Sequence, residues 1–264
     1  MNIREKSSDL LSLDGKVAVI SGGASGIGFG TAHKLAVFGA KVIILDVDSA
    51  KGVKAEKELG GIGPEIKFIR CDVRIPGDCK DAVDKINTIF GKIDILFNNA
   101  GVAIRKNAVE LEPEEWDLAL DVSLKGQYLL TKYIVPIMRA NGGGSIINTG
   151  SGWSFKGGPD AVSYCAMKGG TLNMTRAMAI DFGKDNIRVN CVCPGDIDTP
   201  MLKSECEQLG GVYDDDYKKQ CAVGRPLGRL GTVEDVANTV LFLAGRMSEW
   251  ITGTSIVVDG GGIA

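Results

Sequence analysis

One segment near the start of the chain limits the possible folds more than any other. An apolar run rich in β-branched residues (residues 17–20) leads into the glycine-rich loop SGGASGIG (21–28). A helical pattern follows over residues 27–38, and a second apolar run ends at Asp46. This order, within about thirty residues, predicts a strand, a helix and a parallel second strand, which together form one βαβ unit.

The same alternation of strand and helix continues to the end of the chain. Further strands are expected at residues 66–69, 93–97, 145–148, 187–192 and 255–258, and helices at residues 79–90, 113–138 and 160–182. The alternation predicts an α/β fold with a single Rossmann-type, doubly wound parallel sheet of about seven strands and helices on both faces. In such a sheet, ligands bind at the carboxyl ends of the strands.

No linker or shift of composition divides the chain, so residues 1–264 are expected to form a single dinucleotide-binding and catalytic domain. Residues 1–11 are expected to be a flexible tail, and the irregular insert at residues 202–229 to be a lid over the substrate. Thr232 and Asp235 predict a capping box at the start of the helix that follows the insert.

The glycine-rich loop predicts a nucleotide-binding site. Gly22, Gly26 and Gly28 let the backbone approach a pyrophosphate and let the helix pack closely against its strand. The phosphates would then lie at the positive N-terminal end of that helix.

Asp46, twenty residues after Gly26, predicts a preference for NAD. A carboxylate at this strand end accepts hydrogen bonds from both hydroxyls of an adenosine ribose and repels a 2′-phosphate. Ser25 precedes Gly26 and Val47 follows Asp46, so no neighbouring cation favours NADP. The alternative is that Asp46 only caps the helix that begins near Ser49.

A second group of residues indicates an acid/base catalyst. Tyr164 and Lys168 are four residues apart in a predicted helix, so they share one face. A lysine ammonium beside a phenol lowers the phenol's pKa from about 10, which makes the tyrosine an acid/base group near neutral pH. The spacing alone is also typical of a core aromatic residue and a solvated lysine. The catalytic interpretation is favoured by polar residues at other strand ends, namely Asp46, Asp72, Asn98, Ser151 and residues 194–199.

Composition argues against several other classes of protein. The formal net charge of −3, without a Lys/Arg stripe, argues against nucleic acid as a partner, and no apolar run reaches the roughly 18 residues that span a membrane. The charged N-terminus is unlike a secretory signal. The one histidine, His33, is interpreted as structural and allows no zinc cage. Seven cysteines without a C-x-x-C motif are expected to be reduced thiols in a cytoplasmic protein, with no metal site.

The sequence resembles the short-chain dehydrogenase/reductase family over about residues 12–262. The residues that carry the resemblance are SGGASGIG (21–28), Asp46, CDV (71–73), NNAG (98–101), Ser151, YCAMK (164–168) and PGDIDTPM (194–201). The resemblance implies that Tyr164 is the catalytic acid/base and that Lys168 lowers its pKa and binds the nicotinamide ribose. Ser151 would hold the substrate oxygen, and Trp153 would line the substrate pocket.

The resemblance also implies which residues bind NAD. Asp72 and Val73 would contact the adenine, while Ile197 and Thr199 would engage the carboxamide. The full set of expected cofactor-binding residues is Gly22, Ser25, Gly26, Ile27, Gly28, Asp46, Asp72, Val73, Asn98, Ala100, Gly101, Tyr164, Lys168, Pro194, Gly195, Ile197 and Thr199.

One position departs from the family's pattern. Ser123 stands where asparagine is usual, in a slot that joins a water-linked proton relay to the lysine, largely through its main-chain carbonyl. A serine can hydrogen-bond to the preceding helical turn and bend the helix. A helix bent in this way would still present the main-chain carbonyl of Ser123 to the relay.

The sequence therefore predicts an NAD(H)-dependent oxidoreductase that interconverts a secondary alcohol and a ketone. Its small-molecule substrate is expected to be a ring or polyol carbinol, such as a sugar acid, a polyol or a hydroxysteroid. The alternatives are a 3-oxoacyl thioester reductase and an NAD-binding sensor or scaffold with a weakened relay. Asp196 would either steer polar substrates or only stabilise its own turn. The family commonly pairs its two long helices, here residues 114–140 and 160–182, between subunits, so a homotetramer or dimer is expected.

Overall fold

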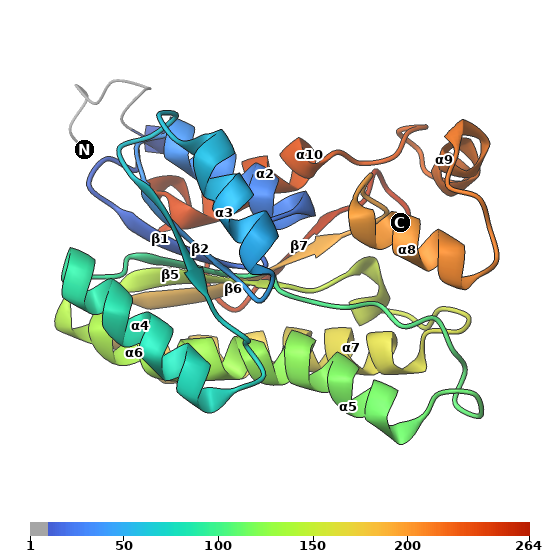
Figure 1. The fold of residues 1–264 in the computed structure, drawn as a ribbon, viewed down its shortest axis with the longest axis horizontal. Helices are drawn as coiled ribbons and strands as arrows, with labels where there is room; N and C mark the ends of the chain where they lie inside the picture. The colour runs from blue at the N-terminus through green and yellow to red at the C-terminus, as the bar shows by residue number, and fades with distance from the viewer. Residues whose placement is uncertain (1–9) are drawn as a thin grey trace.

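The structure, a computed structural model, describes residues 10–264. Its centre is one sheet of seven parallel strands in the order β3-β2-β1-β4-β5-β6-β7, which confirms the predicted Rossmann-type sheet (Figure 1). The strands are β1 (Val17–Ser21), β2 (Lys41–Asp46), β3 (Ile66–Arg70), β4 (Ile95–Asn98), β5 (Gly144–Thr149), β6 (Ile187–Pro194) and β7 (Ser255–Val258). Because every neighbouring pair is parallel, the carboxyl ends of all strands lie along one edge. Of the predicted tail, residues 1–9 lie outside the described residues.

Helices cover both faces of the sheet (Figure 1). One layer holds α2 (Gly26–Val37), α3 (Ser49–Leu59) and α10 (Val233–Ala244), and the other holds α4 (Pro76–Phe90), α6 (Gly126–Ala140) and α7 (Val162–Phe182). Successive strand residues therefore enter different apolar cores: Val19 and Ile20 of β1 are both fully buried, one in each core. Burial on both faces explains why the strands are continuous apolar runs in the sequence.

Two helices begin at other residues than the sequence predicts. α4 begins at Pro76 instead of Cys79, because the fixed φ of proline suits the first turn of a helix. α7 begins at Val162, because Asp160, the predicted start, has a left-handed φ of 49° and lies outside the helix.

The run predicted as one or two helices at residues 113–138 has an unexpected interruption. α5 (Pro113–Leu120) continues through a π-helical segment, Asp121–Lys125, directly into α6. A π-helical turn is rare, and it is found most often near functional sites.

The insert at residues 202–229 is partly helical. It contains most of α8 (Pro200–Gln208) and all of α9 (Asp215–Ala222), which lie beside the C-terminus at one end of the molecule (Figure 1). The capping box predicted after it is confirmed, because Thr232 Oγ1 accepts a hydrogen bond from the Asp235 backbone and the Asp235 carboxylate accepts one from the Thr232 backbone.

A chain of buried polar side chains joins the middle of the sheet to α7. Asn98 Nδ2 of β4 donates to Asn148 Oδ1 of β5 at 2.9 Å, and Asn148 Nδ2 donates to Thr175 Oγ1 of α7 at 3.0 Å. The three side chains are fully buried. Since an unsatisfied buried polar group is costly, this chain fixes how α7 sits on the strands.

We predict that Asn148→Ala lowers the free energy of unfolding by about 3 kcal/mol, because it leaves polar groups of Asn98 and Thr175 without this partner and opens a small cavity. Urea unfolding followed by far-UV circular dichroism measures the change. Asn173→Ala, on the exposed side of α7, is the control and should cost less than about 0.5 kcal/mol. Equal losses in the two variants would contradict a structural role for the buried chain.

Candidate active site

Two adjoining cavities open at the carboxyl edge of the sheet. The glycine-loop cavity, of about 420 Å³, lies between the loop after β1 and the ends of β2, β3 and β4. The tyrosine cavity, of about 150 Å³, lies between the end of β5, α7, the segment after β6 and the C-terminal residues. The residues that line both cavities are Ile27, Asn99, Gly101, Val102, Thr199 and Met201.

The glycine-loop cavity has a backbone cradle at the start of α2. Gly22 and Gly26 have φ values of 63° and 53°, which side-chain-bearing residues rarely adopt. A Cβ atom on Gly28 would lie 2.2 Å from the Gly22 carbonyl oxygen, so only glycine allows α2 to pack so closely on the loop. The N-terminus of α2, with its positive dipole end, faces this cradle. The arrangement fits a dinucleotide's pyrophosphate.

Asp46 lines the glycine-loop cavity at the end of β2. Its Oδ2 accepts a hydrogen bond from the Ala24 backbone at 3.2 Å, which ties β2 to the glycine-rich loop. Asp48, and not Asp46, caps α3, since its Oδ1 accepts from the Lys51 backbone at 3.0 Å. The alternative interpretation of Asp46 as the cap of that helix is therefore wrong.

The far end of the glycine-loop cavity holds Asp72, Val73 and a cation that the sequence analysis overlooked, Arg74. The Asp72 carboxylate accepts hydrogen bonds from Arg74 Nη2 at 2.6 Å and Nε at 2.9 Å, which lowers the pKa of Asp72. The guanidinium is therefore already engaged by a carboxylate.

Asn98 and Asn99 have different surroundings. The side chain of Asn98, expected at the cofactor site, is fully buried in the polar chain described above and lines neither cavity. Asn99, one residue later, lines both. Asn98 is the last residue of β4, while Asn99 lies beyond the strand at the edge where the cavities open, so an error of one position exchanges a core residue for a cavity residue.

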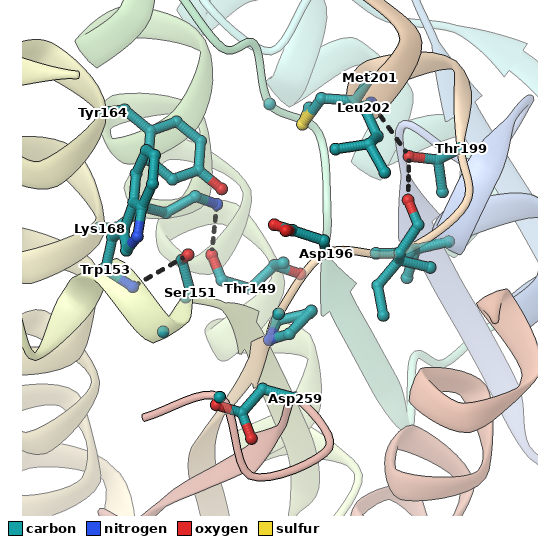
Figure 2. A pocket seen from close by; sticks show the side chains of 18 of the residues that line it. Thr149, Ser151, Trp153, Tyr164, Lys168, Asp196, Thr199, Met201, Leu202 and Asp259 are labelled. Carbon is teal, nitrogen blue, oxygen red and sulfur yellow. Dashed lines mark hydrogen bonds between the residues drawn. The ribbon is translucent and has the colours of Figure 1, made fainter. Parts of the chain in front are cut away.

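The tyrosine cavity brings together the predicted catalytic residues (Figure 2). Ser151 follows β5, and Tyr164 and Lys168 lie on α7. The Lys168 Nζ atom donates to the Thr149 carbonyl at 2.8 Å and lies 5.6 Å from the centre of the Tyr164 ring. Trp153 packs edge-to-face on that ring with centroids 5.7 Å apart, and its backbone N–H donates to Ser151 Oγ at 3.1 Å.

The electrostatics of this pair correct the prediction made from spacing alone. Burial raises the pKa of Tyr164 above its ordinary value, and the nearby Glu205 carboxylate raises it further, while a hydrogen bond with Ser151 opposes both. Burial also lowers the pKa of Lys168 to about 8. A buried ammonium is itself costly, so Lys168 alone does not lower the pKa of Tyr164 as expected.

The remaining residues expected at the cofactor site mostly line one cavity or the other. In the glycine-loop cavity are Gly22, Ser25, Gly26, Ile27, Ala100 and Gly101, and in the tyrosine cavity are Pro194, Gly195, Ile197 and Thr199. Gly28 and Ser123 line neither.

Ser123 lies inside the π-helical segment and is fully buried. Its Oγ accepts a hydrogen bond from the Val102 backbone at 3.2 Å, so the hydroxyl links the helix to the segment after β4. The hydroxyl of Ser123 therefore bonds to the segment after β4, whereas the sequence predicted a bond to the preceding helical turn. The π-helical geometry, invisible in the sequence, is what distinguishes this position.

The wall of the tyrosine cavity beyond Tyr164 includes residues that sequence reasoning missed. They are Lys156, Glu205, Arg225, Asp259 and Ile263, together with Asp196, which the sequence left open. No periodic pattern marks them, because they come from loops, α8 and the C-terminus. Within residues 10–264, no cluster of His, Cys, Asp or Glu could hold a metal ion. In that same range, no helix is long and apolar enough to span a membrane.

The chain is similar to known proteins in both sequence and fold. Residues 22–262 match the family model described as enoyl-(acyl carrier protein) reductase. The chain is 37% identical over 252 residues to the 3-oxoacyl-[acyl-carrier-protein] reductase FabG of Thermotoga maritima, covering 95% of this chain and 99% of that protein. It is 37% identical over 251 residues to dehydrogenase/reductase SDR family member 6 of Danio rerio, covering 94% and 98%. The crystal structure of levodione reductase superposes with a TM-score of 0.90 at 30% identity, covering 94% and 97%.

The buried lysine predicts how stability depends on pH. The pKa of Lys168 is about 8 in the folded protein against an ordinary value of 10.5, so between these values the unfolded chain binds more protons. The free energy of unfolding should therefore rise from pH 8 to pH 10.5, by about 3 kcal/mol from this residue.

Urea unfolding between pH 7.5 and 10.5, in wild type and Lys168→Met, measures this effect. The variant should lack the rise, whereas Lys184→Met, at an exposed position, should keep it. All three proteins keep Tyr164, so its titration is present in every curve and the difference between the curves reports the loss of Lys168. Parallel curves for wild type and Lys168→Met would overturn the prediction.

Proposed function

The chain belongs to the short-chain dehydrogenase/reductase family, and we propose that it is an NAD(H)-dependent oxidoreductase that interconverts a secondary alcohol and a ketone. The observation that carries this proposal is the meeting of Ser151, Tyr164 and Lys168 in a cavity that adjoins the glycine-loop cavity. A nicotinamide held in the shared wall would face the oxygen-binding side chains directly.

The chain's own residues have distinct tasks in this reaction. Bound NAD supplies the hydride acceptor and, in its oxidised ring, a positive charge. Ser151 and Tyr164 hold the carbinol oxygen, and Tyr164 takes its proton during oxidation and returns it during reduction. Lys168, fixed by the Thr149 carbonyl, places a second positive charge beside the phenol and would bind the nicotinamide ribose. Together the two charges offset the burial that holds Tyr164 in its neutral form.

We propose NAD over NADP as the cofactor because of Asp46. Its carboxylate lies at the end of β2 in the cavity wall, where it accepts ribose hydroxyls and repels a 2′-phosphate. Arg74 lies in the same wall, but Asp72 already binds its guanidinium. Asp46 therefore decides the preference.

Two other functions have specific support. The similarity to the reductase of Thermotoga maritima favours a 3-oxoacyl thioester substrate, and Ser123 in the relay slot favours a nucleotide-binding sensor. A panel of polyols, sugars, hydroxysteroids and a 3-hydroxyacyl thioester, assayed at the NADH absorbance band, separates these functions. Binding of NAD without any turnover would favour the sensor.

We also propose that the protein works in the cytoplasm as a homo-oligomer and that the insert at residues 202–229 acts as a lid. Two large apolar side chains are highly exposed: Ile180, near the end of α7, is 82% exposed, and Trp250, between α10 and β7, is 99% exposed. Exposed apolar side chains of this size favour a subunit interface.

The insert contributes Leu202, Glu205 and Arg225 to the wall of the tyrosine cavity, which supports its role as a lid.

Tyr164→Phe should reduce kcat by about 10²- to 10⁴-fold, because the variant keeps the ring but loses the group that transfers the proton. Formation of NADH from the best substrate of the panel measures the loss. Titration calorimetry with NAD should give an unchanged Kd, since the ring still fills its site against Trp153. Retained turnover would exclude Tyr164 as the acid/base.

Asp46→Ser should change the ratio of kcat/KM for NAD to that for NADP by about 100-fold in favour of NADP. Removing the carboxylate relieves like-charge repulsion of roughly 3 kcal/mol against the 2′-phosphate. Asp48→Ser is the control, because it lies two residues away, keeps an α3 capping side chain and lines neither cavity. An unchanged ratio in Asp46→Ser would refute the proposed role of this carboxylate.

A further inference from the structure

Three carboxylates line the tyrosine cavity, Asp196, Glu205 and Asp259, and the first two are each paired with an arginine. Glu205, on α8, is 15% exposed in its side chain, and Asp196, after β6, is 42% exposed. Figure 2 shows the Asp196 carboxylate pointing into the cavity toward Tyr164 and Lys168. Neither Glu205 nor Asp196 is required for proton or hydride transfer, so their presence beside the reacting centre needs another explanation.

Each of these two carboxylates is held by one arginine through one oxygen. Glu205 Oε2 accepts from Arg105 Nη1 at 3.0 Å, and Asp196 Oδ2 accepts from Arg225 Nη2 at 2.5 Å. Within residues 10–264, neither Glu205 Oε1 nor Asp196 Oδ1 accepts a hydrogen bond. Both carboxylate groups line the cavity and carry the lone pairs for a further donor.

Arg105 is itself fixed by further contacts, so the Glu205 carboxylate is preorganised. Arg105 also donates to the Pro159 carbonyl at 3.0 Å and to the Asp160 carbonyl at 3.3 Å, and its guanidinium stacks 4.9 Å from the centre of the Trp153 ring. Its side chain is 10% exposed, and that of Arg225 is 15% exposed. A carboxylate held this firmly gives its free oxygen a defined direction.

The charge balance decides which kind of donor fits. Glu205 and Asp196 are each already paired with a guanidinium, so each pair is close to neutral. The third carboxylate of the cavity, Asp259, is opposed in charge by Lys156 and Lys168, which line the same cavity. A substrate ammonium would meet this arginine charge as well as the carboxylate, whereas a neutral hydroxyl gains the hydrogen bond without that repulsion. An aliphatic acyl chain offers no donor and would cover both free oxygens, which leaves buried acceptors unpaired.

We propose that the substrate is a neutral polyhydroxylated molecule, a polyol or a sugar, with hydroxyl groups beyond the reacting carbinol that donate to Glu205 and Asp196. This inference deepens the proposed alcohol dehydrogenase function and rests on it. The two carboxylates are specificity-determining residues: they bind the substrate, while Ser151 and Tyr164 hold the oxygen that reacts. A site built to bind hydroxyl groups discriminates strongly against analogues that lack them.

A matched substrate series tests the proposed class. The rates of NADH formation would be compared for cyclohexanol, cyclohexane-1,2-diol, an inositol, 2-aminocyclohexanol and a 3-hydroxybutyryl thioester. We expect kcat/KM to rise about tenfold or more from the mono-alcohol to the polyol. Equal or better use of cyclohexanol, the thioester or the amino alcohol would overturn the inference and leave the dehydrogenase function standing. No turnover of any compound would contradict the proposed function and, with it, this inference.

Glu205→Gln and Asp196→Asn test the residues. In each variant the amide oxygen stays with the arginine, so the amide NH₂ replaces the free acceptor by a donor of the same size. The polyol-to-cyclohexanol ratio of kcat/KM should fall about tenfold. The ratio is the right measure, because Glu205 also raises the pKa of Tyr164 and its loss changes the rate with every alcohol.

Glu207→Gln is the matched control for Glu205→Gln. Glu207 lies on the same helix in an exposed ion pair with Lys203 at 3.8 Å and lines neither cavity, so its substitution should leave the ratio within twofold. Thermal melting confirms that each variant is folded. An unchanged ratio in folded Glu205→Gln and Asp196→Asn would overturn the assignment of these side chains.

Discussion

Parallel pairing of the strands is the constraint on which the rest of the molecule depends. Because β1, β4, β5 and β6 run in one direction, the residues that follow them meet at a single edge. That edge carries the glycine-rich loop, Asn99, Ser151 and the segment that includes Asp196. Parallel strands require long crossovers, and one of these crossovers is α7, which brings Tyr164 to the same edge. The two cavities adjoin for this reason.

Burial disfavours the charged forms of both acid/base side chains in the active site. It moves the pKa of Tyr164 upward and that of Lys168 down to about 8, so the isolated pair favours a neutral phenol beside an ammonium that loses its proton more easily than an exposed lysine does. In the proposed reaction, the positive charge of an oxidised nicotinamide would favour the phenolate only when the hydride acceptor is in place. The protonation state of Tyr164 would then be coupled to cofactor binding through electrostatics.

The sequence predicted the sheet and most of the residues that line the two cavities, because both follow from local patterns. Continuous apolar runs and the glycine spacing at Gly22, Gly26 and Gly28 depend on neighbouring residues only. It failed at Asn98, where a shift of one residue exchanges core and cavity, and at the π-helical turn around Ser123, which has no sequence signature. Likewise, burial raises the pKa of Tyr164, and the four-residue spacing between Tyr164 and Lys168 gives no information about burial.

The substrate wall is the part that no local pattern could predict. Arg105 and Glu205 are a hundred residues apart, and Asp196 and Arg225 are joined only because the insert folds back over the sheet edge. These contacts belong to tertiary structure alone. The two groups of residues therefore have different roles. Residues at the strand ends and on α7 carry out the proposed reaction, while residues of the loops and α8 determine which substrate binds. A change of substrate would therefore need new side chains only in the second group, with the sheet and its catalytic edge left intact.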